Sequence, residues 1–182
     1  MDNSRTLTLT GRIFSDHSLT LLLLSNLLTL VLAVVQQWDV RVLMWIYWGQ
    51  SVIIGYFNVH RILALENFTT SGFMINDKPV QRTAAGKRQT ALLFAMHYGI
   101  FHLGYMVFLA TLSGVQPGFP LFGMLVCILA FYLNHRFSYH YNRERDLEGI
   151  PNIGNLMAYP YVRIVPMHLS LIHISEPTRP MK

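Results

Sequence analysis

Long apolar runs, each close to the length that crosses a bilayer, constrain this chain more than any other feature. A hydrocarbon core about 30 Å thick requires about 20 mostly apolar residues in a helix. Four runs meet this requirement, at residues 18–35, 42–60, 91–113 and 119–140. A fifth run, at residues 156–168, is cut short and contains two prolines and an arginine. The pattern predicts an all-α protein, a polytopic transmembrane helix bundle with four full spans and a truncated fifth.

The balance of polar and apolar residues agrees with a membrane protein and excludes other classes. Only 13% of the residues are charged and 52% are hydrophobic, whereas about a quarter of a soluble domain is charged. Disordered, collagenous and coiled-coil chains need a polar or repeating composition that this sequence does not have. Cys127 is the only cysteine, so neither a disulfide framework nor a cysteine-based zinc site is expected.

Lysine and arginine are distributed unevenly between the two sides that the predicted spans define. If the loops alternate across the membrane, eleven of these residues before the C-terminal tail fall on one side, and only Arg41 falls on the other. Because lysine and arginine concentrate in cytoplasmic loops, we expect a multi-pass protein of the inner (cytoplasmic) membrane with a cytoplasmic N-terminus. This orientation also explains the net charge of +5. The expected partner is therefore the lipid bilayer and not nucleic acid.

The C-terminal residues differ in character from the rest of the chain. Residues 169–179, LSLIHISEPTR, resemble a translated sequencing adapter. A segment of this kind is excluded from reasoning about the fold. We therefore expect a single transmembrane domain over residues 1–168, truncated at its C-terminus, followed by a non-native tail over residues 169–182.

Two connections carry turn-forming residues. The sequence QPGFP at residues 116–120 predicts a tight turn that makes the third and fourth spans an antiparallel hairpin. The one sizeable loop covers residues 63–89, and its NDKP sequence at residues 76–79 predicts a turn. The apolar start of this loop fits a short helix at the membrane interface or a free linker equally well.

Glycines within the predicted spans suggest where helices approach one another. Two lie in the second span, Gly49 and Gly55, and two lie in the third, Gly99 and Gly104. Small residues let helix backbones come close together inside membranes. We expect these four positions to serve packing.

Polar side chains inside the spans are the candidates for function. Such groups are costly in hydrocarbon and usually face the interior of the bundle. Histidines lie within or at the ends of the spans, at His60, His97, His102, His135, His140 and His168. All of them fall in the predicted cytoplasmic half or near the midplane. This placement predicts a shared polar cavity open to the cytoplasm, with His97, His102, His135, His168, Asn58 and Asn134 as its candidate residues.

Two functions are compatible with such a cavity and a third needs none. Imidazole gains and loses a proton near neutral pH, which favours transport of a small solute or a proton relay. Further hydrogen bonds would come from Asn26, Gln50, Ser51, Tyr98 and Tyr105. Alternatively, the polar side chains bond across helices and hold together a structural or partner-binding membrane subunit.

The other alternative is a membrane-embedded, metal-dependent enzyme. His97 and His102 are five residues apart, as are His135 and His140, and five residues rotate about 140° around a helix. Neither pair therefore presents both rings to one ion, since a helical zinc pair needs a spacing of four. A metal would need ligands from several helices, namely His97, His135 and His168. No cofactor is otherwise expected, and the sequence leaves open whether the protein is an enzyme and whether it forms oligomers.

Several short strings carry a resemblance to a known family. They are YFNVHR at 56–61, HYGIFH at 97–102, LNHRFS at 133–138, PNIG at 151–154, PYVR at 160–163 and PMH at 166–168. Together they resemble an uncharacterised prokaryotic integral-membrane family, the domain of unknown function 6498, over residues 42–168. The resemblance implies a polytopic fold that continues into at least one more helix. It implies no established activity, substrate or cofactor.

Overall fold

The computed structural model describes residues 17–113 and 120–162 of the 182-residue chain. It contains the helices α2 (His17–Val35), α3 (Val40–Ala64), α4 (Ala84–Ser113), α5 (Leu121–Glu148) and α6 (Ile153–Ala158), and the short strands β1 (Met74–Ile75) and β2 (Lys78–Pro79). The predicted tail at residues 169–182 lies outside the described residues, so its origin stays a prediction.

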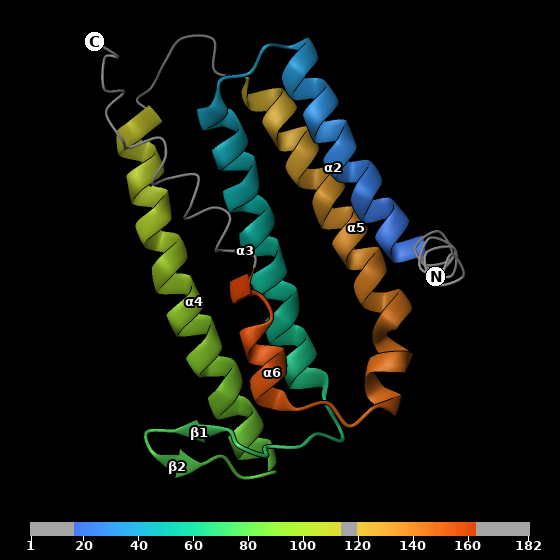
Figure 1. Ribbon diagram of the computed structural model, residues 1–182, viewed down its shortest axis with the longest axis vertical. Coiled ribbons are helices and arrows are strands. Elements are labelled where there is room, and N and C mark those ends of the chain that lie inside the picture. Colours follow the sequence, from blue (N-terminus) through green and yellow to red (C-terminus); the bar gives the residue numbers. More distant parts are fainter. Residues whose placement is uncertain (1–16, 114–119, 163–182) are drawn as a thin grey trace, which may run out of the picture.

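Helix α3 lies at the centre of the molecule. It packs against α4 on one side and α5 on the other, and α2 packs on α5 (Figure 1). The short helix α6 lies against α3 and α4. The third and fourth predicted spans, α4 and α5, are therefore not packed as a hairpin, because α3 lies between them (Figure 1). Residues 116–119 of the predicted turn lie outside the described residues. A turn motif predicts that the chain reverses direction, but it does not predict which helices become neighbours.

Three helices are long and apolar enough to cross a membrane, over Val40–Ala64, Ala84–Thr111 and Leu121–Tyr141. They agree with the second, third and fourth predicted spans. Helix α2 coincides with the first predicted span, and the part of it that was searched for apolar character covers Leu23–Val35. A crossing by α2 therefore stays a prediction.

The predicted fifth span, residues 156–168, is described only in part. Within residues 156–162 the chain finishes the six-residue helix α6, makes a turn at residues 159–160 and is helical again at residues 161–162. Residues 163–168 lie outside the described residues. The fifth span as a whole thus stays a prediction.

Two of the membrane-length helices extend well beyond their apolar runs. Helix α4 begins at Ala84, before the predicted start at residue 91, and α5 continues to Glu148, past the predicted end at residue 140. Both extensions contain charged residues, and residues with a high helix propensity lie beside them. Hydropathy marks the part of a helix that lies in lipid, whereas backbone hydrogen bonding continues the helix into the polar region.

The outward surfaces of the long helices carry large apolar side chains. Examples with more than half of their surface exposed are Leu92, Ile100, Leu103, Val107 and Phe122. Such a surface suits hydrocarbon, since a helix satisfies its own backbone hydrogen bonds there. Three candidate spans and this surface identify a multi-pass membrane protein in contact with lipid.

The largest cluster of buried side chains joins α3, α4, α6 and the loop that connects α3 to α4. Ile62, Phe94 and Ile153 are fully buried, and Leu65 and Phe68 from the loop belong to the same cluster. The apolar start of the loop is therefore neither a separate interfacial helix nor a free linker. It extends α3 and then folds into the core.

A β-hairpin forms the outer part of this loop. Strands β1 and β2 pair antiparallel, and the connecting Asn76 and Asp77 have φ angles of 51° and 59°. Two-residue hairpin loops of this twist need positive φ at both positions, which asparagine and aspartate tolerate. The predicted turn at residues 76–79 is confirmed. Basic residues gather at the same end of the molecule, at Arg61, Lys78, Arg82, Lys87 and Arg88.

The start of α6 is fixed to this loop. Thr69 forms a parallel bridge with Asn152, and its carbonyl accepts a hydrogen bond from the Ile153 N–H at 3.0 Å. The Asn152 side chain caps α6 by accepting from the Gly154 N–H at 2.9 Å. A Cβ atom at Gly154 would lie 2.8 Å from the Phe73 ring. A glycine is therefore needed where α6 meets the loop.

The opposite end of α3 is held by Asp39. Its Oδ1 accepts a hydrogen bond from the Arg41 backbone N–H at 2.8 Å, and its Oδ2 lies 2.8 Å from Arg41 Nη2. Hydrogen bonds from the Arg41 side chain and then from its backbone lower the pKa of Asp39 to about 2. Since the pKa is lower in the folded state, this stabilisation is present above about pH 4 and is lost as the pH falls toward 2.

We predict that Asp39→Ala lowers the free energy of unfolding by about 1 kcal/mol at pH 7, because an N-cap acceptor is lost. Asp39→Asn keeps an acceptor and loses only an exposed ion pair, so its effect is expected to be smaller. Loss of helical circular dichroism on titration with sodium dodecyl sulfate measures both. Equal losses in the two variants would assign the stabilisation to the charge and not to the cap.

Candidate functional site

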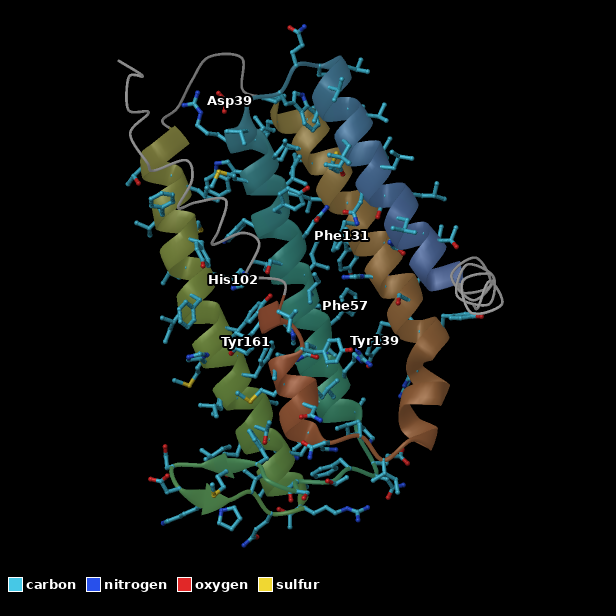
Figure 2. The ribbon with its side chains drawn as sticks, in the orientation of Figure 1. Asp39, Phe57, His102, Phe131, Tyr139 and Tyr161 are labelled. Carbon is cyan, nitrogen blue, oxygen red and sulfur yellow. The ribbon has the colours of Figure 1, made fainter. Side chains whose placement is uncertain are left out.

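His102 is the one predicted histidine that the structure buries in contact with other polar side chains among the described residues. It is 4% exposed and lies on the side of α4 that faces α3 (Figure 2). Its Nδ1 atom is 2.8 Å from the Tyr98 carbonyl oxygen, one helical turn earlier. A carbonyl oxygen can only accept, so Nδ1 carries a hydrogen. The other ring nitrogen, Nε2, therefore faces α3 as the atom that can change its protonation.

Ser51 on α3 connects His102 to Tyr98. Its Oγ atom is 2.9 Å from His102 Nε2 and 2.8 Å from the Tyr98 hydroxyl. The Tyr98 hydroxyl also donates to the Ser51 carbonyl oxygen at 2.9 Å. All three side chains are buried, and the Tyr98 and His102 rings stack with their centroids 4.1 Å apart. We call this group the Ser51–Tyr98–His102 cluster.

The heavy atoms of the cluster suit both protonation states of His102. With a neutral ring, the Ser51 hydroxyl donates to Nε2. With a protonated ring, Nε2–H donates to Ser51 Oγ, and the serine hydrogen turns toward the Tyr98 hydroxyl. In both arrangements Tyr98 donates to the Ser51 carbonyl, and each polar hydrogen has an acceptor. Rotation of the Ser51 hydroxyl group is therefore enough to switch the hydrogen bonds between the two protonation states of His102.

Gly55 makes the cluster possible. It lies one turn after Ser51 on α3, and the Tyr98 ring occupies the space where a Cβ atom would be. The Tyr98 hydroxyl therefore reaches back to Ser51. Trp48 adds a second link between the helices, since its indole Nε1–H donates to the His102 carbonyl at 2.9 Å.

The four predicted packing glycines divide into two pairs. A Cβ atom at Gly49 would lie 2.9 Å from Ile128, so Gly49 and Gly55 both serve close contacts. At Gly99 and Gly104, no described atom lies within 4 Å of that position. The prediction of close helix approach is therefore wrong for this second pair among the described residues. They lie on the lipid-facing side of α4.

His97 lies on a different face of α4 from His102. Its Nδ1 atom is 2.8 Å from the hydroxyl of Tyr161, which follows α6. The Tyr161 ring also packs 5.6 Å from the Tyr98 ring, measured between centroids. Tyr161 therefore contacts His97 through its hydroxyl group and the Ser51–Tyr98–His102 cluster through its ring.

The two predicted asparagines hold helices together. The Asn58 side-chain nitrogen donates to the Leu156 carbonyl at 3.1 Å and so binds α6 to α3. The Asn134 side-chain nitrogen donates to Ser25 Oγ at 3.3 Å and connects α5 to α2. Both are buried, and each partner belongs to a different helix.

His135 is surrounded by aromatic rings between α3 and α5. Its centroid is 4.4 Å from that of Phe131 and 6.2 Å from that of Phe57. Phe57, Phe131 and Tyr139 fill the space between these helices (Figure 2). His97, His102 and His135 therefore have separate surroundings in the described structure.

Within the described ranges, no three histidine, cysteine or acidic residues are grouped closely enough to hold a metal ion. The predicted set of His97, His135 and His168 includes a residue outside those ranges, so this alternative stays a prediction. His60 and His140 each contact a neighbouring tyrosine on their own helix, Tyr56 and Tyr139.

Two roles were not predicted from the sequence. The indole of Trp48 bonds to the backbone of α4 beside the cluster. Tyr161 was expected within a fifth span, but it contacts α4 through His97. No signal in the sequence pairs these residues, since their partners are 54 and 64 residues away.

We predict that Gly55→Ala lowers stability by about 1–3 kcal/mol, because the added methyl group displaces the Tyr98 ring from a filled space. Gly99→Ala is the matched control. Its methyl group meets no described atom, and alanine favours a helix over glycine by about 1 kcal/mol. Thermal unfolding of the two variants in detergent measures the difference, and a loss at residue 99 equal to that at residue 55 would contradict this account of the contact.

Comparison with known proteins gives one match. No curated protein and no solved structure is significantly similar to the chain. A family described as a family of unknown function (DUF6498) matches residues 8–175. This range exceeds the predicted extent of the resemblance, residues 42–168, at both ends. Because the match covers most of the sequence, the chain belongs to the DUF6498 family.

Proposed function

We propose that this membrane protein relays protons through the Ser51–Tyr98–His102 cluster. The observation that carries the proposal is the pair of hydrogen bonds, 2.8 and 2.9 Å long, that joins the Tyr98 hydroxyl to His102 Nε2 through one serine. Both are of ordinary length for a hydrogen bond. The cluster lies between two membrane-length helices, where polar side chains are costly and usually functional.

The chemistry of the three side chains is suited to this role. A proton from water replaces the hydroxyl proton that Tyr98 passes to Ser51 Oγ, while Ser51 passes its own hydroxyl proton to His102 Nε2. The reverse transfers release the stored proton, since the other ring nitrogen already carries a hydrogen. A proton then moves along the chain while the heavy atoms keep their positions. The fixed hydrogen on Nδ1 holds the ring in the orientation that aims Nε2 at Ser51. His102 is the group that stores the proton, since an imidazole nitrogen is more basic than the hydroxyl groups of serine and tyrosine.

Proton flux into liposomes tests the proposal. The full chain is reconstituted with an interior pH dye, and a pH gradient is imposed. His102→Phe retains an aromatic ring beside Tyr98 but cannot carry a proton, and Ser51→Ala breaks the chain at its centre. We expect each variant to reduce flux by about 100-fold, the scale on which a positioned proton donor or acceptor acts.

His140→Ala is the control, because His140 contacts Tyr139 near the end of the apolar part of α5 and lies outside the cluster. Its flux is expected to equal that of the parent protein. If His102→Phe and Ser51→Ala lower the melting temperature and leave flux unchanged, the cluster holds the helices together and has no relay function.

The proposal includes the orientation predicted from the sequence. The hairpin end of the molecule, with Arg61, Lys78 and Arg82, would face the cytoplasm, because basic residues are retained there. We expect a phosphatase reporter inserted between Asn76 and Asp77 in the full chain to be inactive and a fluorescent protein there to be active. The reverse result would place the hairpin outside the cell and overturn the orientation.

A further inference from the structure

One side of helix α4 is exposed along most of its length, because α4 lies at the edge of the bundle (Figure 1). Residues four apart share a helix face. Four residues with this spacing form an inclined row on the exposed side of α4, namely Arg88, Leu92, Met96 and Ile100. The three apolar side chains are 61%, 58% and 67% exposed, and Arg88 is exposed as well. We call these four residues the Arg88–Ile100 row.

Gly99 borders the apolar part of this row, since it lies three residues after Met96 and four before Leu103. No described atom lies within 4 Å of the position that a Cβ atom at Gly99 would occupy. Leu103 is 57% exposed and continues the apolar surface beyond the glycine. An extended apolar chain can therefore lie close to the helix at Gly99, with large apolar side chains beside it.

The row has the depth of one leaflet of a bilayer. The apolar run of α4 begins at residue 91, so a rise of 1.5 Å per residue places Arg88 about 5 Å outside it. The polar layer on each side of a bilayer is about 5–8 Å thick, so Arg88 lies at the level of the headgroups. Ile100 lies about 18 Å further along the helix, and one leaflet with its headgroups is about 20 Å thick.

Arg88 differs from the basic residues beside it in having no partner among the described residues. Lys87 Nζ donates to the Leu65 carbonyl at 2.7 Å, and Arg82 Nη2 donates to Asn67 Oδ1 at 3.4 Å. A guanidinium group presents a planar set of donors that matches the oxygens of a phosphate group. Arg88 is therefore available to bind an anion at the membrane surface.

We propose that the Arg88–Ile100 row binds one anionic phospholipid of the surrounding bilayer. The Arg88 guanidinium donates to the phosphate oxygens, and one acyl chain lies along Leu92, Met96 and Ile100 beside Gly99. The occupant is a phospholipid and not a free phosphate ion, because the cation and the apolar side chains share one helix face at the depths of a headgroup and its chain. The site is independent of the proposed proton relay.

Native mass spectrometry of the full chain in detergent tests the site. The protein is titrated separately with phosphatidylglycerol, phosphatidylcholine and glycerol 3-phosphate, and the bound fraction gives each dissociation constant. We expect phosphatidylglycerol to bind more tightly than zwitterionic phosphatidylcholine. Glycerol 3-phosphate has the phosphate without the acyl chains, and we expect it to bind far more weakly than phosphatidylglycerol.

Arg88→Gln removes the charge and keeps a side chain of similar length. We expect it to weaken phosphatidylglycerol binding about fivefold, the scale set by one basic residue at an anionic membrane surface. Lys78→Gln is the matched control, because it removes the same charge at the same end of the molecule from an exposed residue in strand β2. Its dissociation constant is expected to equal that of the parent protein. Because both residues are exposed, both variants are expected to keep the helical circular dichroism of the parent.

Unchanged binding of phosphatidylglycerol to the Arg88→Gln variant would overturn the site. Equal weakening in the Arg88→Gln and Lys78→Gln variants would also overturn it, since that result indicates a general attraction between charges. If glycerol 3-phosphate binds as tightly as phosphatidylglycerol, Arg88 recognises a soluble phosphate and the phospholipid assignment is wrong. None of these outcomes depends on proton flux, so the site and the relay are tested separately.

Discussion

The need to satisfy polar groups away from water governs this structure. In hydrocarbon, an unpaired hydroxyl, amide or imidazole costs several kcal/mol, and no solvent is present to offset that cost. The buried side chains of the candidate site therefore bond to a different helix or to the backbone of their own. Gln50, which was expected to supply a further hydrogen bond, differs, because its buried side-chain nitrogen has no partner among the described residues. Ser51 and Tyr98 join α3 to α4, Asn134 joins α5 to α2, and Asn58 joins α6 to α3. The hydrogen bonds that determine which helices pack together also bring together the polar side chains of the candidate site.

Close packing and polar bonding depend on each other at the centre of the bundle. The Tyr98 hydroxyl reaches Ser51 only because Gly55 leaves room for the phenol ring on the surface of α3. The stacked ring of His102 then lies with Nε2 toward the same serine. Side chains three or four residues apart share a helix face, so Ser51 and Gly55 on one helix meet Tyr98 and His102 on the other. A single seam between α3 and α4 thus produces the candidate site.

Local features of the fold were predictable from the sequence, and long-range pairings were not. Hydropathy located the membrane-length helices, and Asn76 and Asp77 located the hairpin turn because few residues tolerate positive φ. His102 was among the candidates because a histidine inside an apolar run is costly wherever it lies. Which residues meet it depends on the order of the helices in space, with α3 between α4 and α5 (Figure 1), and hydropathy carries no information about that order. For the same reason, Tyr161 could not be assigned to His97.

The central position of α3 has a consequence for biosynthesis. The ribosome delivers a chain from its N-terminus, so α3 reaches the bilayer before any of the helices that satisfy it. Ser51 must wait for Tyr98, which is synthesised 47 residues later, and Asn58 must wait for a carbonyl 98 residues later. Throughout that interval these two side chains need water or another protein as a temporary hydrogen-bond partner at the insertion machinery. Release of α3 into lipid is therefore expected to be coupled to the arrival of α4, which makes the nascent hairpin of these two helices the earliest unit able to assemble.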